Sequence, residues 1–313
     1  MDLQLTIRKQ VTAEGVGLHS GQPSKITLSP APADSGIAFR ATDPHRTLIP
    51  ARRETVVDSR FATTLGVNGA RVQTVEHLMA AAAALGIDNL LVEVEGEEIP
   101  AMDGSARPFV ALLYAAGKAT LGAPRQPLVI TQPIRVGDDA RWLQILPSDE
   151  FRVSYTLDVD HPVVGTQAAS FTCTERVFVE ELASARTYGF LKDVGTLRKN
   201  GLAKGGSLDN AVVVGRRAVL NSSLRYRDEF VRHKILDLIG DLALLGRPVL
   251  GHVVARNAGH ALNHALVNAI AEFFASKPRS ARATVPALSH YVSRLEGARR
   301  GGGVGARPGI AAL

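Results

Sequence analysis

The chain is organised around one stretch, residues 228–246, which reads DEFVRHKILDLIGDLALLG. At about 100° per residue, His233, Asp237 and Asp241 fall within one narrow polar arc of a helix. Lys234 falls within the same arc, and apolar side chains take most of the opposite side. The pattern predicts an amphipathic helix with a chemically dense polar face.

Two residues of this face have the spacing of metal ligands. His233 and Asp237 stand at i and i+4, so an imidazole nitrogen and a carboxylate oxygen can converge one turn apart. A catalytic zinc site uses three such protein ligands and leaves the fourth position to water. Taken alone, such a pair is more often a solvated or salt-bridged face. The metal interpretation therefore needs a third ligand, a base and an acid from elsewhere in the chain.

The length and composition of the chain limit the number of domains and the kinds of metal site that it can form. The chain has 313 residues, of which 45% are hydrophobic, and this length favours two domains of about 120 to 150 residues. The single cysteine, Cys173, excludes an intramolecular disulfide and a multi-cysteine metal site. The first residues carry charges where a signal peptide needs an apolar core, and no apolar run approaches the roughly 18 residues of a membrane span. We therefore expect a cytoplasmic protein without a transmembrane segment.

The positive charge of the chain belongs to one end. The formal net charge is +6, and residues 277–313 contain seven Lys or Arg residues and one Glu, so the rest of the chain is neutral. A neutral body lacks the basic surface of a nucleic-acid-binding domain, and we expect no nucleic-acid partner. The basic tail could still contact an acidic membrane or RNA, or be a frayed terminus.

A second helix is predicted near residues 74–86. Thr74 is the expected N-cap, an alanine run follows, and Gly86 lies just past the end. Glu76 and His77 then occupy the first turn, where the helix dipole favours a carboxylate and disfavours an imidazolium. A neutral histidine ligand and an ionised base both require these conditions. In the alternative, Glu76 stabilises the helix terminus and His77 is an ordinary satisfied polar residue.

The two halves of the chain repeat one order of elements: helix, glycine, strand, loop and helix. The strands are predicted at 89–94 and 249–255, and the helices that follow them at 107–117 and 262–276. Two similar α/β units, joined by a link at 121–126, would each offer one polar helix to a shared interface. This arrangement would bring His77 to His233 and Asp237.

Two further histidines are candidates for the site. His260 begins the last helix, and Asp241 could accept a hydrogen bond from its ring and hold it protonated. Alternatively, His260 is a capping or surface residue. His19 lies at the tip of a glycine-rich loop and is a candidate substrate contact.

Five motifs follow one another along the chain. They read VEHL (75–78), IPAMDGS (99–105), ARTYGF (185–190), HKILDLIGD (233–241) and GHALN (259–263). From about residue 3 to residue 276, their order and spacing closely resemble the LpxC family, the UDP-3-O-acyl-N-acetylglucosamine deacetylases of lipid A synthesis. The resemblance implies an α+β fold of two similar two-layer α/β domains, with the helices sandwiched between two sheets. Residues 1–122 would form the N-terminal domain, 127–276 the C-terminal domain, and 277–313 a basic, partly disordered tail.

The resemblance also implies a metal centre. His77, His233 and Asp237 would hold one catalytic Zn²⁺, leaving a position for water. Zinc lowers the pKa of bound water towards about 7 and polarises a substrate carbonyl. Ferrous iron would tolerate the same three ligands.

Catalytic roles follow from the resemblance, residue by residue. Glu76 would take the proton of the attacking water, and Thr187 would help to stabilise the oxyanion. His260, held charged by Asp241, would protonate the leaving amine, although one carboxyl group could serve as both base and acid. Lys234 would position the substrate or its diphosphate.

Substrate contacts are implied at both ends of the ligand. The insert at about 188–214, with Phe190, Leu191 and Gly206, would form an apolar passage for the acyl chain, whereas without the resemblance it would be interpreted as ordinary core. Arg141 matches a basic position of the UDP surface, and His19 is kept as a further contact. Another basic position of the family is Asn257 here, which leaves the diphosphate contacts open.

The resulting expectation is a zinc-dependent enzyme. It would hydrolyse the N-acetyl group of UDP-3-O-(3-hydroxyacyl)-N-acetylglucosamine, giving acetate and the free amine in the committed step of lipid A synthesis. We expect a monomer, and a tail that is dispensable for chemistry. The alternatives are a zinc amidase acting on a different N-acyl sugar and a non-catalytic nucleotide-sugar binder.

Overall fold

Two helices, one from each half of the chain, cross at the centre of the fold. The computed structural model describes residues 2–276, and in it α1 (Glu76–Ala84) packs against α5 (Glu229–Leu242). A Cβ atom at Gly240 would lie 2.1 Å from the carbonyl oxygen of Glu76. Only glycine therefore permits this close crossing. Ala80, Ala81 and Ala82 of α1 are fully buried, because small side chains let neighbouring elements approach closely.

Residues 228–246 contain the predicted helix, which is α5. Its last turn tightens into a 3₁₀ segment, η3 (Ala243–Leu245), and Gly246 ends it with a φ of +69°. The predicted N-cap of α1 is wrong. Thr74 has a φ of +60° and its hydroxyl donates to Oε1 of Glu98 at 2.9 Å, so Val75 precedes the helix instead. The buried carboxylate of Glu98 takes the hydroxyl that would otherwise have capped α1.

The first half contains a five-stranded sheet with β9 at its centre. Its strand order is β2 (Val11–Val16), β3 (Pro23–Pro30), β9 (Leu90–Glu95), β4 (Ile37–Arg40) and β5 (Leu48–Pro50). Only the pairing of β9 with β4 is parallel. Beside it are η1 (Arg53–Thr55), the small sheet β6 (Val56–Asp58), β7 (Thr64–Val67) and β8 (Ala70–Gln73), and the pair β1 (Leu3–Ile7) with β10 (Lys118–Pro124).

The second half repeats this topology around β18. The strand order is β12 (Ile134–Gly137), β13 (Trp142–Leu146), β18 (Val249–Arg256), β14 (Phe151–Val159) and β15 (Gly165–Thr172), with β11 (Leu128–Val129) added to β18. Among these five strands, β18 pairs in parallel only with β14, as β9 does with β4. The repeated order predicted from the sequence is thus confirmed at the level of strand pairing.

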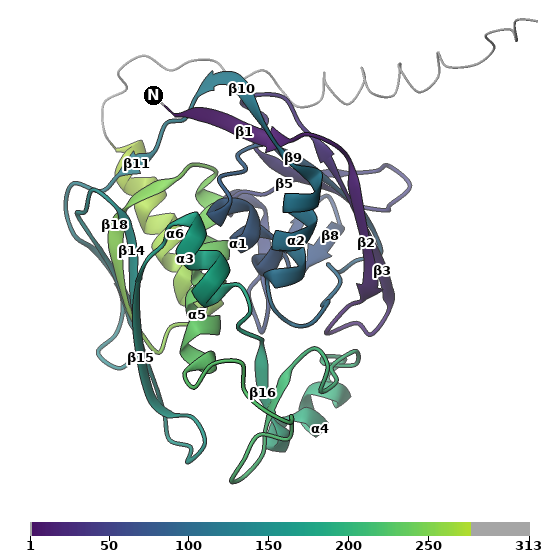
Figure 1. Cartoon of the computed structure of the whole chain (residues 1–313), viewed down its shortest axis with the longest axis vertical. Helices are drawn as coiled ribbons and strands as arrows, with labels where there is room; N and C mark the ends of the chain where they lie inside the picture. Colours follow the sequence, from purple (N-terminus) through teal and green to yellow (C-terminus); the bar gives the residue numbers. More distant parts are fainter. Residues whose placement is uncertain (1, 277–313) are drawn as a thin grey trace, which may run out of the picture. The chain divides into compact units, whose positions relative to one another are not determined.

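The helices α1, α2, α5 and α6 lie between these two sheets (Figure 1). α5 packs on β14 and β15, α6 (His260–Ala275) packs on β12 and β13, and α2 (Arg107–Ala116) packs on α1 and β2. The fold is α+β, as expected. The apolar core fills the space between the helices and the inner faces of the strands, where alternate residues are buried, as along β18.

The predicted insert forms a small structure outside this core. It contains β16 (Tyr188–Phe190) paired in parallel with β17 (Val212–Val214), and α4 (Leu191–Lys199), which has no buried residue. Figure 1 shows it projecting beyond the end of α5. Before the insert come the short helix α3 (Glu175–Val177) and a π-helical turn, η2 (Phe178–Leu182).

The predicted division of residues 1–276 into two domains stays a prediction. Residues 2–276 belong to a single compact unit, and the boundary between residues 122 and 127 stays a prediction. The expected link is partly strand, because β10 runs to Pro124 and pairs with Leu3. No helix within 2–276 has the length and apolarity to cross a membrane. The predictions for the basic tail, 277–313, lie outside the described residues.

Candidate active site

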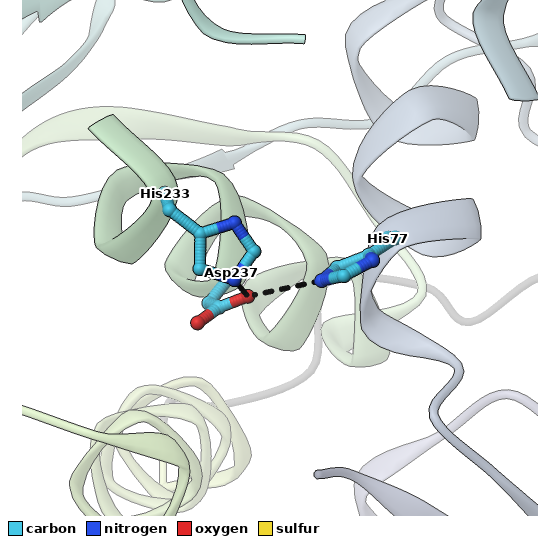
Figure 2. Close-up of side chains that lie close together, drawn as sticks. All are labelled: His77, His233 and Asp237. Atoms are coloured by element: carbon cyan, nitrogen blue, oxygen red, sulfur yellow. Dashed lines mark ion pairs between the residues drawn. The ribbon is translucent and has the colours of Figure 1, made fainter. Parts of the chain in front are cut away.

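Three buried side chains converge where α1 crosses α5. His77 comes from the first turn of α1, and His233 and Asp237 stand one turn apart on α5 (Figure 2). Oδ1 of Asp237 lies 3.3 Å from Nε2 of His233 and 3.5 Å from Nε2 of His77. The three ligand atoms lie within 4.8 Å of one another. The predicted convergence of the two halves at these residues is confirmed.

This donor set fits a divalent metal. Nδ1 of His233 donates to the carbonyl oxygen of Ala185 at 3.1 Å, so its Nε2 presents a lone pair towards Asp237. Burial lowers the pKa of His233 to about 3, which keeps the ring neutral. Burial alone would raise the pKa of Asp237, but the positive charge of Lys234 holds it well below the usual value. Oδ1 of Asp237 is buried and has no hydrogen-bond partner in the described chain, and a cation is the partner that these facing lone pairs require.

A carboxylate adjoins the three ligands. Oε2 of Glu76 accepts a hydrogen bond from the backbone N–H of Thr63 at 3.1 Å, and its Oε1 lies 3.8 Å from Nε2 of His260. The side chain is buried, and burial raises the pKa of Glu76 above its usual value. A fixed carboxylate of raised pKa is suited to accept a proton near neutral pH.

A charged histidine faces this carboxylate. Nδ1 of His260, the first residue of α6, donates to Oδ2 of Asp241 at 2.7 Å. Burial by itself lowers the pKa of His260, but the charge and hydrogen bond of Asp241, followed by Glu76 and Asp237, raise it to about 9. The ring is therefore an imidazolium at neutral pH, and the predicted pairing of His260 with Asp241 is confirmed.

Three residues that were not predicted as part of the site surround Asp241. The hydroxyl of Thr63 donates to its Oδ1 at 2.6 Å, and Nδ2 of Asn263 donates to its Oδ2 at 2.8 Å. Nε2 of His264 lies 2.9 Å from the same hydroxyl, and burial lowers the pKa of this ring. His264 follows His260 at i+4, a spacing that could have indicated it. Thr63 had no comparable signal.

Most of the predicted site residues line one cavity of about 530 Å³. It is lined by His19, Glu76, His77, Arg141, Thr187, His233, Lys234, Asp237 and His260. Asp241 is fully buried and lies behind His260. Phe190, Leu191 and Gly206 do not line this cavity. Phe190 stacks edge-on against Tyr188, which does, at a ring distance of 6.4 Å.

Lys234 forms an ion pair with Asp237, one of the three candidate metal ligands. Its Nζ donates to Oδ2 of Asp237 at 2.7 Å and lies 5.8 Å from the ring centre of Tyr188. Burial alone would lower the pKa of Lys234, but the Asp237 charge outweighs it and raises the pKa. Tyr188 belongs to the ARTYGF motif, yet its place in the cavity wall was not predicted.

The His19 loop is held by a second buried carboxylate. Glu98 accepts hydrogen bonds from the backbone N–H groups of His19 at 2.9 Å and Ser20 at 2.8 Å. Burial is the largest effect on His19 and lowers its pKa. Both of its ring nitrogens are buried without a hydrogen-bond partner in residues 2–276. A polar ring in this state calls for a ligand.

Arg141, Asn257 and Arg256, the positions considered for diphosphate contacts, differ in their hydrogen bonds and ion pairs. Arg141 follows a turn in which Oδ1 of Asp138 accepts its backbone N–H at 2.7 Å, and its guanidinium has no ion-pair partner among the described residues. Asn257 accepts the backbone N–H of Asp158 at 2.7 Å, and Arg256 pairs with the Asp158 carboxylate at 2.8 Å. Of the two arginines, only Arg141 lacks an ion-pair partner among the described residues.

Two histidines and an aspartate, with a neighbouring carboxylate and an imidazolium around one cavity, form the arrangement expected of a metal-dependent hydrolase. The family model that matches residues 4–272 is described as LpxC, UDP-3-O-acyl N-acetylglycosamine deacetylase. The chain belongs to the LpxC family. The resemblance carried by the five motifs is confirmed.

Curated relatives agree over most of their length. The protein named UDP-3-O-acyl-N-acetylglucosamine deacetylase in Myxococcus xanthus (strain DK1622) is 52% identical over 269 residues, covering 85% of this chain and 86% of the relative. The protein of the same name in Anaeromyxobacter sp. (strain Fw109-5) is 50% identical over 268 residues, covering 85% and 88%. That of Oleidesulfovibrio alaskensis (strain ATCC BAA-1058 / DSM 17464 / G20) is 48% identical over 272 residues, covering 86% and 89%.

Proposed function

We propose that this protein hydrolyses the acetyl amide of UDP-3-O-(3-hydroxyacyl)-N-acetylglucosamine and releases acetate, the committed step of lipid A synthesis. The observation that carries the proposal is the buried cluster of His77, His233 and Asp237 beside Glu76 and His260. It lies in a chain about half of whose residues are identical to those of relatives that bear this deacetylase name.

His77, His233 and Asp237 would hold the metal. Their nitrogen and oxygen donors favour zinc, and ferrous iron would accept them as well. When bound, the metal supplies a Lewis acid that polarises an amide carbonyl and lowers the pKa of water. The Ala185 carbonyl orients the His233 ring for this task.

Glu76 would be the general base. The Thr63 N–H fixes one carboxylate oxygen at 3.1 Å, which leaves the other to receive the proton of the attacking water. The raised pKa of Glu76, caused by burial, brings its proton affinity closer to what proton transfer near neutral pH requires.

His260 would be the general acid. Its Nδ1 proton is committed to Asp241, so the Nε2 proton, 3.8 Å from Oε1 of Glu76, is the one available to the leaving nitrogen. Protonation lets that nitrogen leave as a neutral amine when the C–N bond breaks, because an amide anion is a very poor leaving group. Asp241 itself stays behind the imidazolium and keeps it charged.

Thr187 and Lys234 would act on the substrate's polar groups. The Thr187 backbone is fixed by a hydrogen bond from its N–H to the Gly104 carbonyl at 2.8 Å, while its side chain lines the cavity. Its hydroxyl would donate to the developing oxyanion. Lys234, bound to Asp237, would place a positive charge near the sugar and its diphosphate.

The two ends of the substrate would contact different kinds of surface, polar for UDP and apolar for the acyl chain. Arg141 and His19 would contact the UDP portion, and Phe190, Leu191 and Gly206 of the insert would border the acyl chain. An exposed apolar surface supports the second half of this proposal: Leu191 is 49% exposed, and Phe61, in the cavity wall, is 62% exposed. Each buried CH₂ of an acyl chain gains about 0.8 kcal/mol. We further propose a cytoplasmic monomer.

Acetate release from the UDP-linked acylated substrate tests the proposal. We expect activity to vanish after metal removal, to return with one equivalent of zinc, and to stay at least a hundredfold low in Asp237→Ala. Glu180→Ala, which removes an exposed carboxylate, is the control. Full activity of metal-free protein would refute the mechanism. Equal rates on substrates that lack the acyl chain or UDP would indicate a different N-acyl sugar, and zinc binding without turnover would indicate a binder.

A further inference from the structure

A second cavity lies at the opposite ends of the two central helices from the active site. It has a volume of about 430 Å³ and shares no lining residue with the active-site cavity. The last turn of α1 contributes Ala83 and Ala84, and the end of α5 contributes Leu242. This volume is within the range of small-molecule sites, which is about 300 to 1,000 Å³.

The inner wall of this second cavity is apolar. Met79, Phe151, Phe178 and Ile239 line it, together with aliphatic residues of β1, β4 and β18. Met79 and Phe178 are fully buried, so the wall is continuous with the hydrophobic core. A ligand in contact with this wall must offer a hydrocarbon surface.

The rim carries an excess of positive charge. Lys118 pairs with Glu175 at 2.5 Å, and Nε of Arg125 pairs with Oδ1 of Asp88 at 2.9 Å. The fifth charged residue, Arg247, has no carboxylate partner in residues 2–276. Its Nε donates instead to the backbone carbonyl of residue 126 at 2.6 Å.

The rim of this cavity carries two arginine side chains, Arg125 and Arg247. The carbonyl that Arg247 binds belongs to the residue following Arg125, and both arginines line the cavity. Only Nε of the Arg125 side chain pairs with Asp88, and its two terminal nitrogens each lie 3.5 Å from where a Cβ of Gly86 would be. The dipole of α1 explains a cation at Gly86, just beyond its carboxyl end. It does not explain the second, unpaired cation.

We propose that this cavity binds a fatty carboxylate. Its head group lies between Arg125 and Arg247, which present the planar donors that match a carboxylate, and its chain lies against Met79, Phe151 and Phe178. The apolar wall excludes small hydrophilic anions as the preferred ligand, and the excess positive charge excludes a neutral lipid. The site is separate from the proposed acyl passage at 188–214.

Photo-crosslinking with a diazirine-bearing dodecanoate locates the site on the zinc-loaded, full-length protein. We expect labelled peptides from the end of α1 and from residues 239–250. Labelling that is confined to 188–214 would overturn the proposal, because the probe would then occupy only the proposed acyl passage. Turnover is not needed for this readout, so its failure is distinct from failure of the proposed deacetylase activity.

Calorimetric titration with dodecanoate and with dodecanol then tests the chemistry. We expect dodecanoate to bind at least tenfold more tightly, Arg247→Glu to weaken it at least tenfold, and Ala83→Trp, a replacement at an exposed position of the cavity wall, to abolish it. Arg71→Glu, at an exposed position on β8, is the matched control and should leave binding unchanged. Equal affinity for the alcohol, or a loss of binding in the control as large as in Arg247→Glu, would refute the site.

Discussion

Replacing Asp241 with asparagine isolates the charge that holds His260 protonated. Asparagine has the same shape, and its NH₂ group can face the Thr63 hydroxyl, which can accept as well as donate. The amide oxygen can still accept from Nδ1 of His260 and Nδ2 of Asn263, which now bond Oδ2 at 2.7 and 2.8 Å. The variant therefore removes a charge from behind the imidazolium with little change in packing.

The magnitude follows from the pKa of His260. Burial opposes its charged form, and Asp241 is the first of the groups that nevertheless raise its pKa from 6.5 to about 9. This rise corresponds to roughly 3.4 kcal/mol in favour of the imidazolium. Loss of one close opposite charge lowers a pKa by about 1 to 3, so we expect a pKa of roughly 7.5 in the variant. Its acid form would then be lost as the pH rises through roughly 7.5 instead of 9.

The assay is kcat/KM of the zinc-loaded enzyme from pH 6 to pH 9.5. With a pKa of roughly 7.5, the fraction of protonated His260 at pH 8.5 is about eightfold below that of the wild type, whereas at pH 6.5 the two nearly agree. The ratio of wild-type to variant rates should therefore grow about eightfold between these pH values. Glu180→Gln, in an exposed pair with Arg176, should give a flat ratio. A rate loss in Asp241→Asn that is the same at every pH would refute the electrostatic role and leave a structural one.

Three further substitutions test the packing and the positioning around the site. Thr63→Val removes the hydroxyl bonded to Asp241 but keeps the N–H bonded to Glu76, so kcat should fall about tenfold with KM nearly unchanged, as steady-state kinetics would show. Gly240→Ala drives a methyl group into α1 and should lower the free energy of unfolding by about 1 to 3 kcal/mol in urea titrations, whereas Gly195→Ala, where a Cβ meets nothing within 4 Å, should not lower it. Glu229→Ala leaves buried Arg186 without its partner at 2.8 Å and should cost about 3 to 5 kcal/mol by the same titrations. A change under 1 kcal/mol at Gly240, or an unchanged kcat at Thr63, would contradict these assignments.

The sequence predicted the parts of the site that depend on local spacing. His233 and Asp237 are one turn apart on any α-helix, so their convergence needed only the helix itself. The repeated order of helix, glycine, strand, loop and helix was visible because a glycine follows each of the two helices. Gly86 and Gly246 indeed have the positive φ angles typical of a residue that ends a helix. That order gave the two equivalent sheets, and it brought His77 to the other two ligands.

The remaining contacts join residues that no spacing rule connects. Thr63 bonds to Asp241 across 178 positions of the chain, and a threonine before a short strand has no periodic signature. Thr74 shows that a local sequence pattern can also predict a contact that the fold does not make. Its residue type and position matched an N-cap, yet a buried carboxylate, Glu98, gave its hydroxyl a stronger acceptor. Local preference was overridden by a partner that only the tertiary fold supplies.

The polar arc of α5 shows why this distinction matters for function. In an ordinary amphipathic helix the polar arc faces water, but His233, Asp237 and Asp241 are at most 2% exposed. Burying these groups is unfavourable unless each has a partner. Asp241 has its partners in His260, Thr63 and Asn263, whereas Oδ1 of Asp237 has none within the described chain. The one ligand oxygen that the fold leaves unsatisfied is thus the atom that faces both histidines, which is the strongest physical reason for placing a metal there.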